Sequence, residues 1–383
     1  MATNKTVDYR FKILYAIGMI MVVASHASGG GITALSDWFP YHGVHLALFM
    51  FCSGYFYKSS AEDNVSKYIL KKIQVLIVPF YIYNVVYGLI VQFLRTKGFE
   101  MGGDFNLQNL TIAPITSGHQ FVYNMGGWFL VPLFMVEIYN VLLHKLIKRI
   151  YKNTTEWAFG ALEIFAGILG NQLACMGYRQ NWWLVLVRML YFAPFYELGI
   201  LYRSKLETID KKIPSFWYFA VLFAAQLAII YHYGKVPSYI PSWCGDFIEG
   251  PIMPIVIGVL GIALWLRIAN LLEPVIGRSK WINAIADSTY SIMMNQFLGF
   301  MIVKTGYALL SKIGLRFSDF DFVSYKTDIW WFYTPKGITQ TLIVYVVAGP
   351  YSFKRRLTRS NRFYPPDSVS NCKLDSLMKE ARR

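Results

Sequence analysis

The stretch Gly250–Asn270, GPIMPIVIGVLGIALWLRIAN, decides the fold class, because it carries one charged residue, Arg267, among mostly apolar neighbours. A helix of this length crosses the roughly 30 Å hydrocarbon core of a bilayer. The stretch lacks the two-residue alternation of a barrel strand, and lipid requires backbone groups to be satisfied within the segment. It therefore predicts a transmembrane α-helix.

Similar runs recur along the whole chain, in which 55% of residues are hydrophobic and 15% are charged. A soluble domain would carry nearer a quarter charged residues. We therefore expect an all-α polytopic membrane bundle of about ten transmembrane helices, with both termini cytoplasmic. The expected spans are 11–28, 44–58, 68–94, 127–149, 157–175, 182–202, 215–233, 250–270, 284–310 and 337–353.

The net charge of +15 is distributed unevenly among the segments that connect these spans. With a cytoplasmic N-terminus, the cytoplasmic segments hold 26 Lys and Arg and the opposite loops hold 8. This asymmetry follows the positive-inside rule, so it needs no nucleic-acid partner. We expect a multi-pass plasma-membrane protein in contact with membrane lipids, with a transmembrane domain over 1–353 and a basic cytoplasmic tail over 354–383.

Two features of the chain have competing interpretations. The basic N-terminal segment and the apolar run ending near His26 resemble a signal peptide, but the many later spans favour an uncleaved first helix. Cys175 and Cys244 fall near the same membrane face, so a disulfide between them is a minor alternative to two free thiols. Spacings typical of a structural metal site are absent among the cysteines.

Ionisable residues inside spans are costly and therefore mark candidate functional sites. His26 is either an interfacial histidine or a general base, since a neutral imidazole can take up and return a proton near pH 7. His42 and His45 are three residues apart and share a helix face. A metal site formed with His26 is conceivable, but no carboxylate at ligand spacing joins the three, and we expect no metal.

Other charged positions have similarly open interpretations. The cluster of Lys67, Lys71 and Lys72 at the start of a span is either positive-inside bias or a cytoplasmic phosphate site. Arg188 lies deep in a span and needs a partner, for which Glu137 is a candidate at similar depth. Glu163, Glu197 and Arg267 are also buried in spans, either as structural ion pairs or as part of an ion pathway.

The motifs resemble the membrane acyltransferase 3 family along nearly the whole chain. Ile17–His26, IGMIMVVASH, resembles the first family helix, which ends in an essential histidine, and His45–Tyr55, HLALFMFCSGY, resembles the second. Lys67–Phe80 is similar to a basic pair followed by Leu-Pro-aromatic. Weaker similarities begin at Trp128 (WFL), Glu197 (ELGILY) and Ser288 (STYSIM).

The resemblance implies an O-acyltransferase that moves an acyl group, most often acetyl, from acyl-coenzyme A to a hydroxyl of a cell-surface or lipid-linked glycan. In this interpretation His26 is the general base. Arg188 and Glu137 are further catalytic candidates. The donor would bind at Lys12, Tyr15, Lys67, Lys71 and Lys72, and the acceptor at His45, Ser53, Tyr55, Trp128 and Asn295.

Two positions depart from the family pattern. The family usually has Arg or Lys eleven residues before the histidine, where this chain has Tyr15, about 16 Å along the helix from His26. Either Lys12 or Arg10 is positioned to supply that charge. The late helix often carries a histidine where this chain has Asn295 or Gln296.

Two other functions remain open from the sequence. A secondary transporter or flippase could use Arg188, Glu137 and Glu197 as an ion pathway. Against this function, the chain shows no inverted repeat and no paired broken helices. A non-catalytic sensor or scaffold is the third interpretation, motivated by Tyr15 and Asn295.

Overall fold

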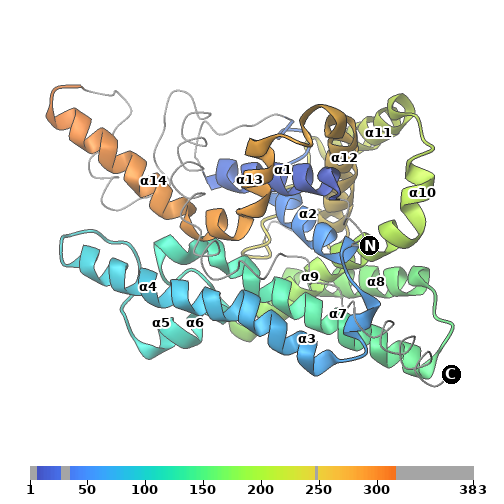
Figure 1. Ribbon diagram of the computed structural model, residues 1–383, viewed down its shortest axis with the longest axis horizontal. Coiled ribbons are helices and arrows are strands. Elements are labelled where there is room, and N and C mark those ends of the chain that lie inside the picture. Colours follow the sequence, from blue (N-terminus) through green and yellow to red (C-terminus); the bar gives the residue numbers. More distant parts are fainter. Residues whose placement is uncertain (1–6, 27–34, 246–248, 316–383) are drawn as a thin grey trace, which may run out of the picture.

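The computed structural model describes residues 7–26, 35–245 and 249–315. The expected span over 337–353, the basic tail and Cys372 lie outside these residues. Within them every regular element is a helix, and the only β-type pairings are two isolated bridges, Gly102–Phe121 and Ile240–Gly245. The predicted all-α class is thus confirmed for the described part (Figure 1).

The helices follow the expected spans closely. Their bounds are α1 (Tyr9–His26), α2 (Tyr41–Tyr55), η1 (Ser59–Ala61), α3 (Val65–Lys72), η2 (Ile73–Ile77), α4 (Val78–Arg95), α5 (Leu107–Thr111), α6 (Ala113–Thr116), η3 (Val122–Phe129), α7 (Leu130–Ile150), α8 (Glu156–Cys175), α9 (Asn181–Leu201), η4 (Tyr202–Leu206), α10 (Glu207–Asp210), α11 (Ser215–Tyr233), α12 (Met253–Ile276), α13 (Lys280–Asp287) and α14 (Thr289–Lys312). Helix η2 joins α3 to α4, and η4 joins α9 to α10, so each pair forms one long helical segment.

Six helical segments in the described part are long and apolar enough to cross a bilayer. Helices α1, α2 and α14 occupy expected spans but are not among the six. Helix α2 has 15 residues, fewer than the roughly 20 that a bilayer requires. Helix α14 is continuous, but its apolar sequence is interrupted by Asn295, Gln296 and Lys304. The expected count of about ten is therefore supported for six spans.

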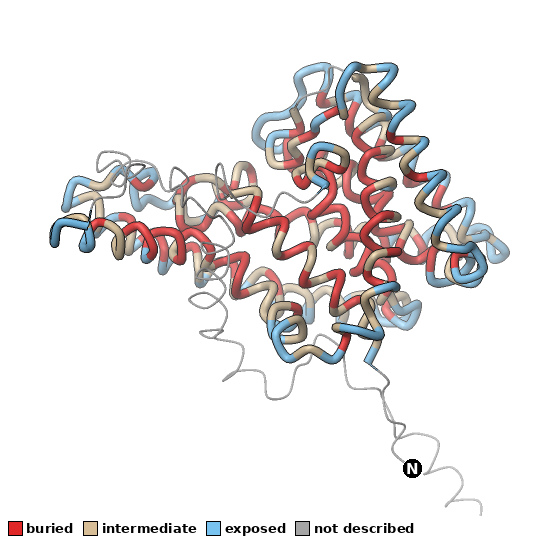
Figure 2. Tube along the Cα trace, turned by 90° about the horizontal axis from the view of Figure 1, so that it is seen from above, coloured by how far each residue is buried: buried red, intermediate tan, exposed pale blue. Residues whose placement is uncertain are grey.

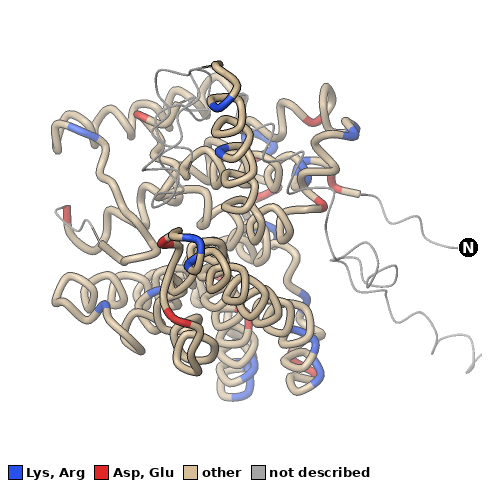
Figure 3. Tube along the Cα trace, turned by 90° about the vertical axis from the view of Figure 1, so that its left-hand side faces the viewer, with Lys and Arg blue, Asp and Glu red and all other residues tan. Residues whose placement is uncertain are grey.

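Helix α9 lies at the centre of the bundle and packs against α2, α7 and α8. Helix α2 packs in turn against α1 and α12, and α14 lies against η3. Buried positions concentrate on these central helices, and exposed positions lie at the periphery (Figure 2). Charged residues are sparse along most helices and gather toward helix ends (Figure 3), as expected of a bundle embedded in lipid.

The contact between α2 and α9 depends on two glycines. A Cβ atom on Gly54 would lie 1.8 Å from the Tyr196 carbonyl oxygen, and one on Gly199 would lie 2.1 Å from the Phe51 carbonyl oxygen. Small residues allow helix backbones to approach this closely in membrane proteins. Gly54 and Gly199 therefore mark the close crossing of α2 and α9.

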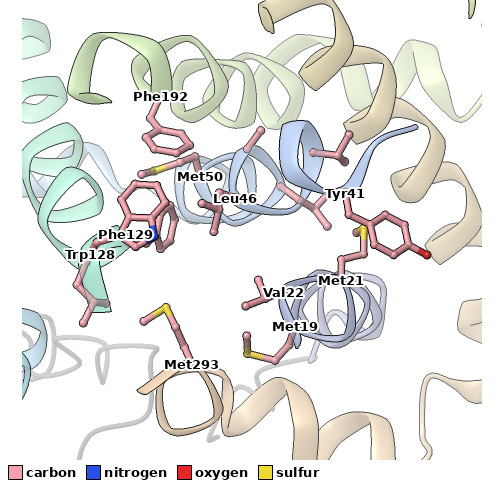
Figure 4. Packing of buried hydrophobic residues seen from close by; sticks show 14 of the residues in the cluster. Met19, Met21, Val22, Tyr41, Leu46, Met50, Trp128, Phe129, Phe192 and Met293 are labelled. Atoms are coloured by element: carbon pink, nitrogen blue, oxygen red, sulfur yellow. The ribbon is translucent and has the colours of Figure 1, made fainter. Parts of the chain in front are cut away.

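Apolar side chains from five elements meet in the middle of the bundle. Figure 4 shows Met19 and Val22 of α1 facing the space that is bordered by Met293 of α14, Phe129 of η3 and Met50 of α2. Because α1, α2, η3, α9 and α14 all contribute, this cluster fixes the position of the ends of these helices. Those ends carry the polar groups described below.

The buried side chain of Asn84 connects several parts of the segment between α4 and η3. The Asn84 carbonyl oxygen accepts hydrogen bonds from the amides of Gln120 (2.5 Å) and Asn124 (3.0 Å). The Asn84 amide nitrogen lies 3.2 Å from the backbone carbonyls of both Asn109 and Leu110. The loop is therefore fixed against α4 and η3.

Candidate active site

Four of the six histidines gather at one end of the bundle, which we call the histidine end: His26, His42, His45 and His119. His26 ends α1, and its ring centroid lies 5.1 Å from that of Phe297 in α14. His42 and His45 lie in the first turns of α2, with ring centroids 6.0 Å apart. His26 is close enough to the other three to interact electrostatically with each.

His45 is held in a defined orientation. It is 5% exposed, and its Nδ1 bonds to the Tyr41 carbonyl oxygen one turn earlier. Because a carbonyl oxygen can only accept, Nδ1 is the protonated nitrogen of the neutral ring and Nε2 carries the lone pair. A histidine fixed in this way presents an acceptor to the site.

Arg188 of α9 reaches the histidine end without a carboxylate partner in the described part of the chain. It donates to the backbone carbonyls of Ser117 (3.1 Å) and Ser242, and its guanidinium lies 4.7 Å from the centroid of the Trp128 ring. The side chain is 1% exposed, and its Nε makes no hydrogen bond within the described residues. The predicted pairing with Glu137 is wrong, because Glu137 accepts from Lys72 at 2.5 Å instead.

His119 also belongs to this end, although no motif or periodic pattern in the sequence pointed to it. Its ring stacks on Trp243 with centroids 4.4 Å apart. Burial and the nearby Arg188 guanidinium lower the pKa of His119 to about 4. The imidazole is therefore neutral at pH 7. Both His119 and Trp243 lie in loops with no periodic pattern, so only the folded structure brings them to Arg188.

The opposite end, which we call the basic end, carries Arg10, Lys58, Lys67, Lys71 and Lys72. Lys67 and Lys71 are exposed, and neither forms an ion pair within the described residues. Lys58 and Lys72 are close enough to Lys71 to interact electrostatically with it. Three predicted donor-binding lysines thus lie together, with Lys58 as a neighbour that sequence reasoning missed.

The start of α1 is bound into an ion-pair network. Arg10 contacts Asp8 at 2.5 Å and Glu207 at 2.9 Å. The Tyr55 hydroxyl donates to Glu207 at 2.9 Å. Tyr55 therefore lies at the basic end, away from the histidines, which does not favour its predicted role in binding an acceptor beside them.

The two cations nearest to Tyr15 in sequence are both engaged. Lys12 pairs with Asp287 of α13, and Arg10 belongs to the network above. The Tyr15 ring lies 5.9 Å from the Phe49 ring. A cavity of about 490 Å³ opens beside α1, but its lining mixes cations with Asp8 and Glu273.

The remaining predicted acceptor residues lie on different elements. Trp128 of η3 is beside Arg188, and Ser53 of α2 is half-buried. The Asn295 side-chain carbonyl of α14 accepts from the Tyr87 hydroxyl, and its amide group donates to the Ser291 carbonyl at 2.8 Å. The structure thus brings Trp128 to the histidine end, and hydrogen bonds to α4 fix Asn295.

Comparison with protein families identifies the chain. The model of an acyltransferase domain, Acyl_transf_3, matches residues 8–354. The chain belongs to this acyltransferase family. The resemblance inferred from the motifs is thereby confirmed. Searches of curated proteins and of solved structures find no match.

In this acyltransferase the family motifs occupy both ends of the bundle. The IGMIMVVASH motif places His26 at the histidine end, and the Lys67–Phe80 motif places the lysines at the basic end. Cys52, Cys175 and Cys244 are free, so the minor alternative of a Cys175–Cys244 disulfide is wrong.

Proposed function

We propose that this membrane acyltransferase moves an acyl group, acetyl in the simplest case, from acyl-coenzyme A to a hydroxyl of a cell-surface or lipid-linked glycan. We place it in the plasma membrane, with the basic end facing the cytoplasm. His26 serves as the general base. The convergence of His26, His42, His45 and His119, the last of which lies near Arg188, inside a domain of the acyltransferase family carries the proposal.

The reaction needs a base and a site for the negative charge that develops. The neutral imidazole of His26 takes the proton of the acceptor hydroxyl, whose oxygen attacks the thioester carbonyl carbon. The carbonyl oxygen becomes an oxyanion, and Arg188 is a buried cation at this end that can stabilise it. The carbon–sulfur bond then breaks, the ester is released, and the imidazolium returns the proton to the coenzyme A thiolate.

The basic end suits the donor, because coenzyme A carries several phosphate charges. Lys67 and Lys71 are exposed and unpaired within the described chain, so their charges are available for phosphate. Lys72 is a weaker candidate, since Glu137 already accepts from it. Lys12 and Tyr15 lie along α1 between the two ends and line the route of an extended donor arm.

The acceptor is placed at the histidine end. Trp128 and His45 are positioned to contact it, with the indole available for packing on a sugar ring and His45 Nε2 for accepting a hydroxyl hydrogen bond. Asn295 and Ser53 are secondary candidates. Tyr55 is better assigned to the ion-pair network of the basic end.

An ion pathway fits the geometry less well. Arg188 bonds to carbonyls at the histidine end, Glu137 pairs with Lys72, and Glu197 contacts His144. These three residues thus make separate contacts and share no direct hydrogen bond or ion pair within the described residues. A transporter or flippase that uses Arg188, Glu137 and Glu197 together is therefore not favoured.

The deciding experiment compares His26→Ala with His232→Ala, an exposed histidine in α11. Purified protein with acetyl-coenzyme A and a candidate acceptor should release thiol, and His26→Ala should reduce this rate by about 10²–10⁴-fold. His232→Ala should retain it. The matching assay in cells is glycan ester content by mass spectrometry in a deletion strain.

The cellular assay distinguishes an enzyme that uses His26 as its base from a non-catalytic scaffold. Ester should return with wild type and His232→Ala and stay absent with folded His26→Ala. Ester content restored by His26→Ala would refute His26 as the base. Thiol release that persists in His26→Ala but disappears in His45→Gln would move that role to His45.

A further inference from the structure

A second polar cluster lies between α7, α8 and α9, apart from both ends described above. Its members are His144 of α7, Glu156 of α8 and Glu197 of α9, and one ligand atom from each lies within 4.8 Å of the others. His144 Nε2 is 2.9 Å from a Glu197 oxygen. Glu197 is nine residues along α9 from Arg188, or about 13 Å, so this cluster is distinct from the histidine end.

Each of the three residues retains a buried atom that makes no hydrogen bond within the described chain. These atoms are His144 Nδ1, Glu156 Oε2 and Glu197 Oε1. Asn140 donates to Glu197 at 2.9 Å, but its own carbonyl oxygen is also unpaired. His144 is 1% exposed and Glu197 is fully buried. Four acceptor-type atoms from neighbouring residues therefore lack donors.

The two carboxylates of the cluster also lack a permanently charged partner among the described residues. Within the described residues, no Lys or Arg forms an ion pair with Glu156 or Glu197. The nearby cation Lys148 is already 2.8 Å from Glu62. A position in the first turn of α8 stabilises the Glu156 carboxylate through the helix dipole, but it does not account for the buried Glu197 Oε1, which makes no hydrogen bond within the described residues.

We propose that His144, Glu156 and Glu197 bind a divalent transition-metal cation of the zinc type, with Asn140 or water completing the coordination. A neutral imidazole nitrogen with two carboxylate oxygens is a donor set that Zn²⁺ accepts in four-coordinate sites. The cation would neutralise the two carboxylates. It would also tie the ends of α7, α8 and α9 together, because each helix contributes one ligand.

The test measures metal content and does not depend on acyl transfer. The full chain is purified in detergent without chelators, dialysed, and analysed for zinc by mass spectrometry. Thermal unfolding is then followed with added ZnCl₂ and, separately, with MgCl₂. We expect about one zinc per chain and a rise in melting temperature with Zn²⁺ that Mg²⁺ does not reproduce.

Glu156→Gln is the informative variant, because it removes the least buried ligand and keeps the shape of the side chain. Glu62→Gln is the matched control, since it removes a carboxylate that has a lysine partner. Loss of zinc in monodisperse Glu156→Gln with retention in Glu62→Gln supports the site. Wild-type protein without zinc or any Zn²⁺-dependent stabilisation overturns it and means that the carboxylates are neutralised by protons.

Discussion

The buried cations at the two ends of the bundle have different kinds of partners. At the basic end, Arg10 pairs with Asp8 and Glu207, and Lys72 pairs with Glu137. At the histidine end, Arg188 is held by backbone carbonyls and an indole ring, and the His119 imidazole lies near it. The partly buried cations Arg10 and Lys72 are therefore compensated locally at the basic end, where the exposed Lys67 and Lys71 stay unpaired within the described residues, whereas the buried Arg188 has no carboxylate partner among those residues.

This difference separates structural roles from chemical ones. A buried ion pair places two charges where each neutralises the other, and breaking it leaves one charge exposed to a low dielectric. An arginine whose partners are carbonyls and an aromatic ring, with no carboxylate among the described residues, keeps its positive charge for a ligand. We therefore assign transition-state stabilisation to Arg188, and phosphate binding to the lysines that remain unpaired.

The largest expected effect comes from removing that uncompensated charge. Arg188→Met should lower turnover by about 10²–10³-fold, as loss of one oxyanion donor does in other enzymes. Arg188→Lys should not restore it, because lysine has neither the planar fork nor the stacking surface for Trp128. Thiol release per folded protein measures both. Full activity in monodisperse Arg188→Met would remove the chemical distinction between the two ends.

The next largest effect is expected at the close crossing of α2 and α9. Gly199→Ala would place a Cβ atom 2.1 Å from the Phe51 carbonyl oxygen, and backbone on both sides must move. We expect destabilisation of about 3 kcal/mol or more, seen as a lower melting temperature in detergent.

Gly306→Ala in α14 provides the matched control, because no atom lies within 4 Å of the added Cβ. That change should be neutral or stabilising by up to about 1 kcal/mol. Equal melting temperatures for the two alanine variants would contradict the close α2–α9 crossing.

The smallest effect is expected at the exposed lysines. The double change Lys67→Ala with Lys71→Ala should raise KM for acetyl-coenzyme A roughly tenfold and leave kcat almost unchanged, with a weaker effect at high salt. Lys235→Ala, an exposed lysine between α11 and α12, should change neither constant. A fall in kcat without a change in KM would place the lysines outside the donor site.

Much of this arrangement could be predicted from the sequence. The apolar runs predicted helix positions to within a few residues, as at 215–233. In lipid an apolar segment must satisfy its own backbone hydrogen bonds, and a helix does so. The motifs also singled out His26 and the lysines as site candidates, which the structure places at opposite ends of the bundle. Short α2 was expected as a span, and only the structure shows that its 15 residues rely on contact with α9.

The sequence could not predict which side chains contact the buried polar residues. Depth along a helix suggested Glu137 for Arg188, but depth does not determine which way a side chain faces, and Glu137 faces Lys72. His119 and His144 were not identified, because a single histidine carries no periodic signal. Their neighbours come from segments distant in the chain, and only the tertiary packing brings them together.

The anchoring of the loop between α4 and η3 by Asn84 has a consequence for exchange with solvent. Surface loops ordinarily exchange their amide hydrogens within seconds, because local opening costs little. Here the Gly103 amide donates to the Gln120 carbonyl and the Val122 amide donates to the Met101 carbonyl. The side chain of Gln120 also donates to Asn84, which anchors the same segment to α4. Deuterium uptake at these amides should therefore be slow, like that of a core helix, and Asn84→Ala should release the whole segment at once.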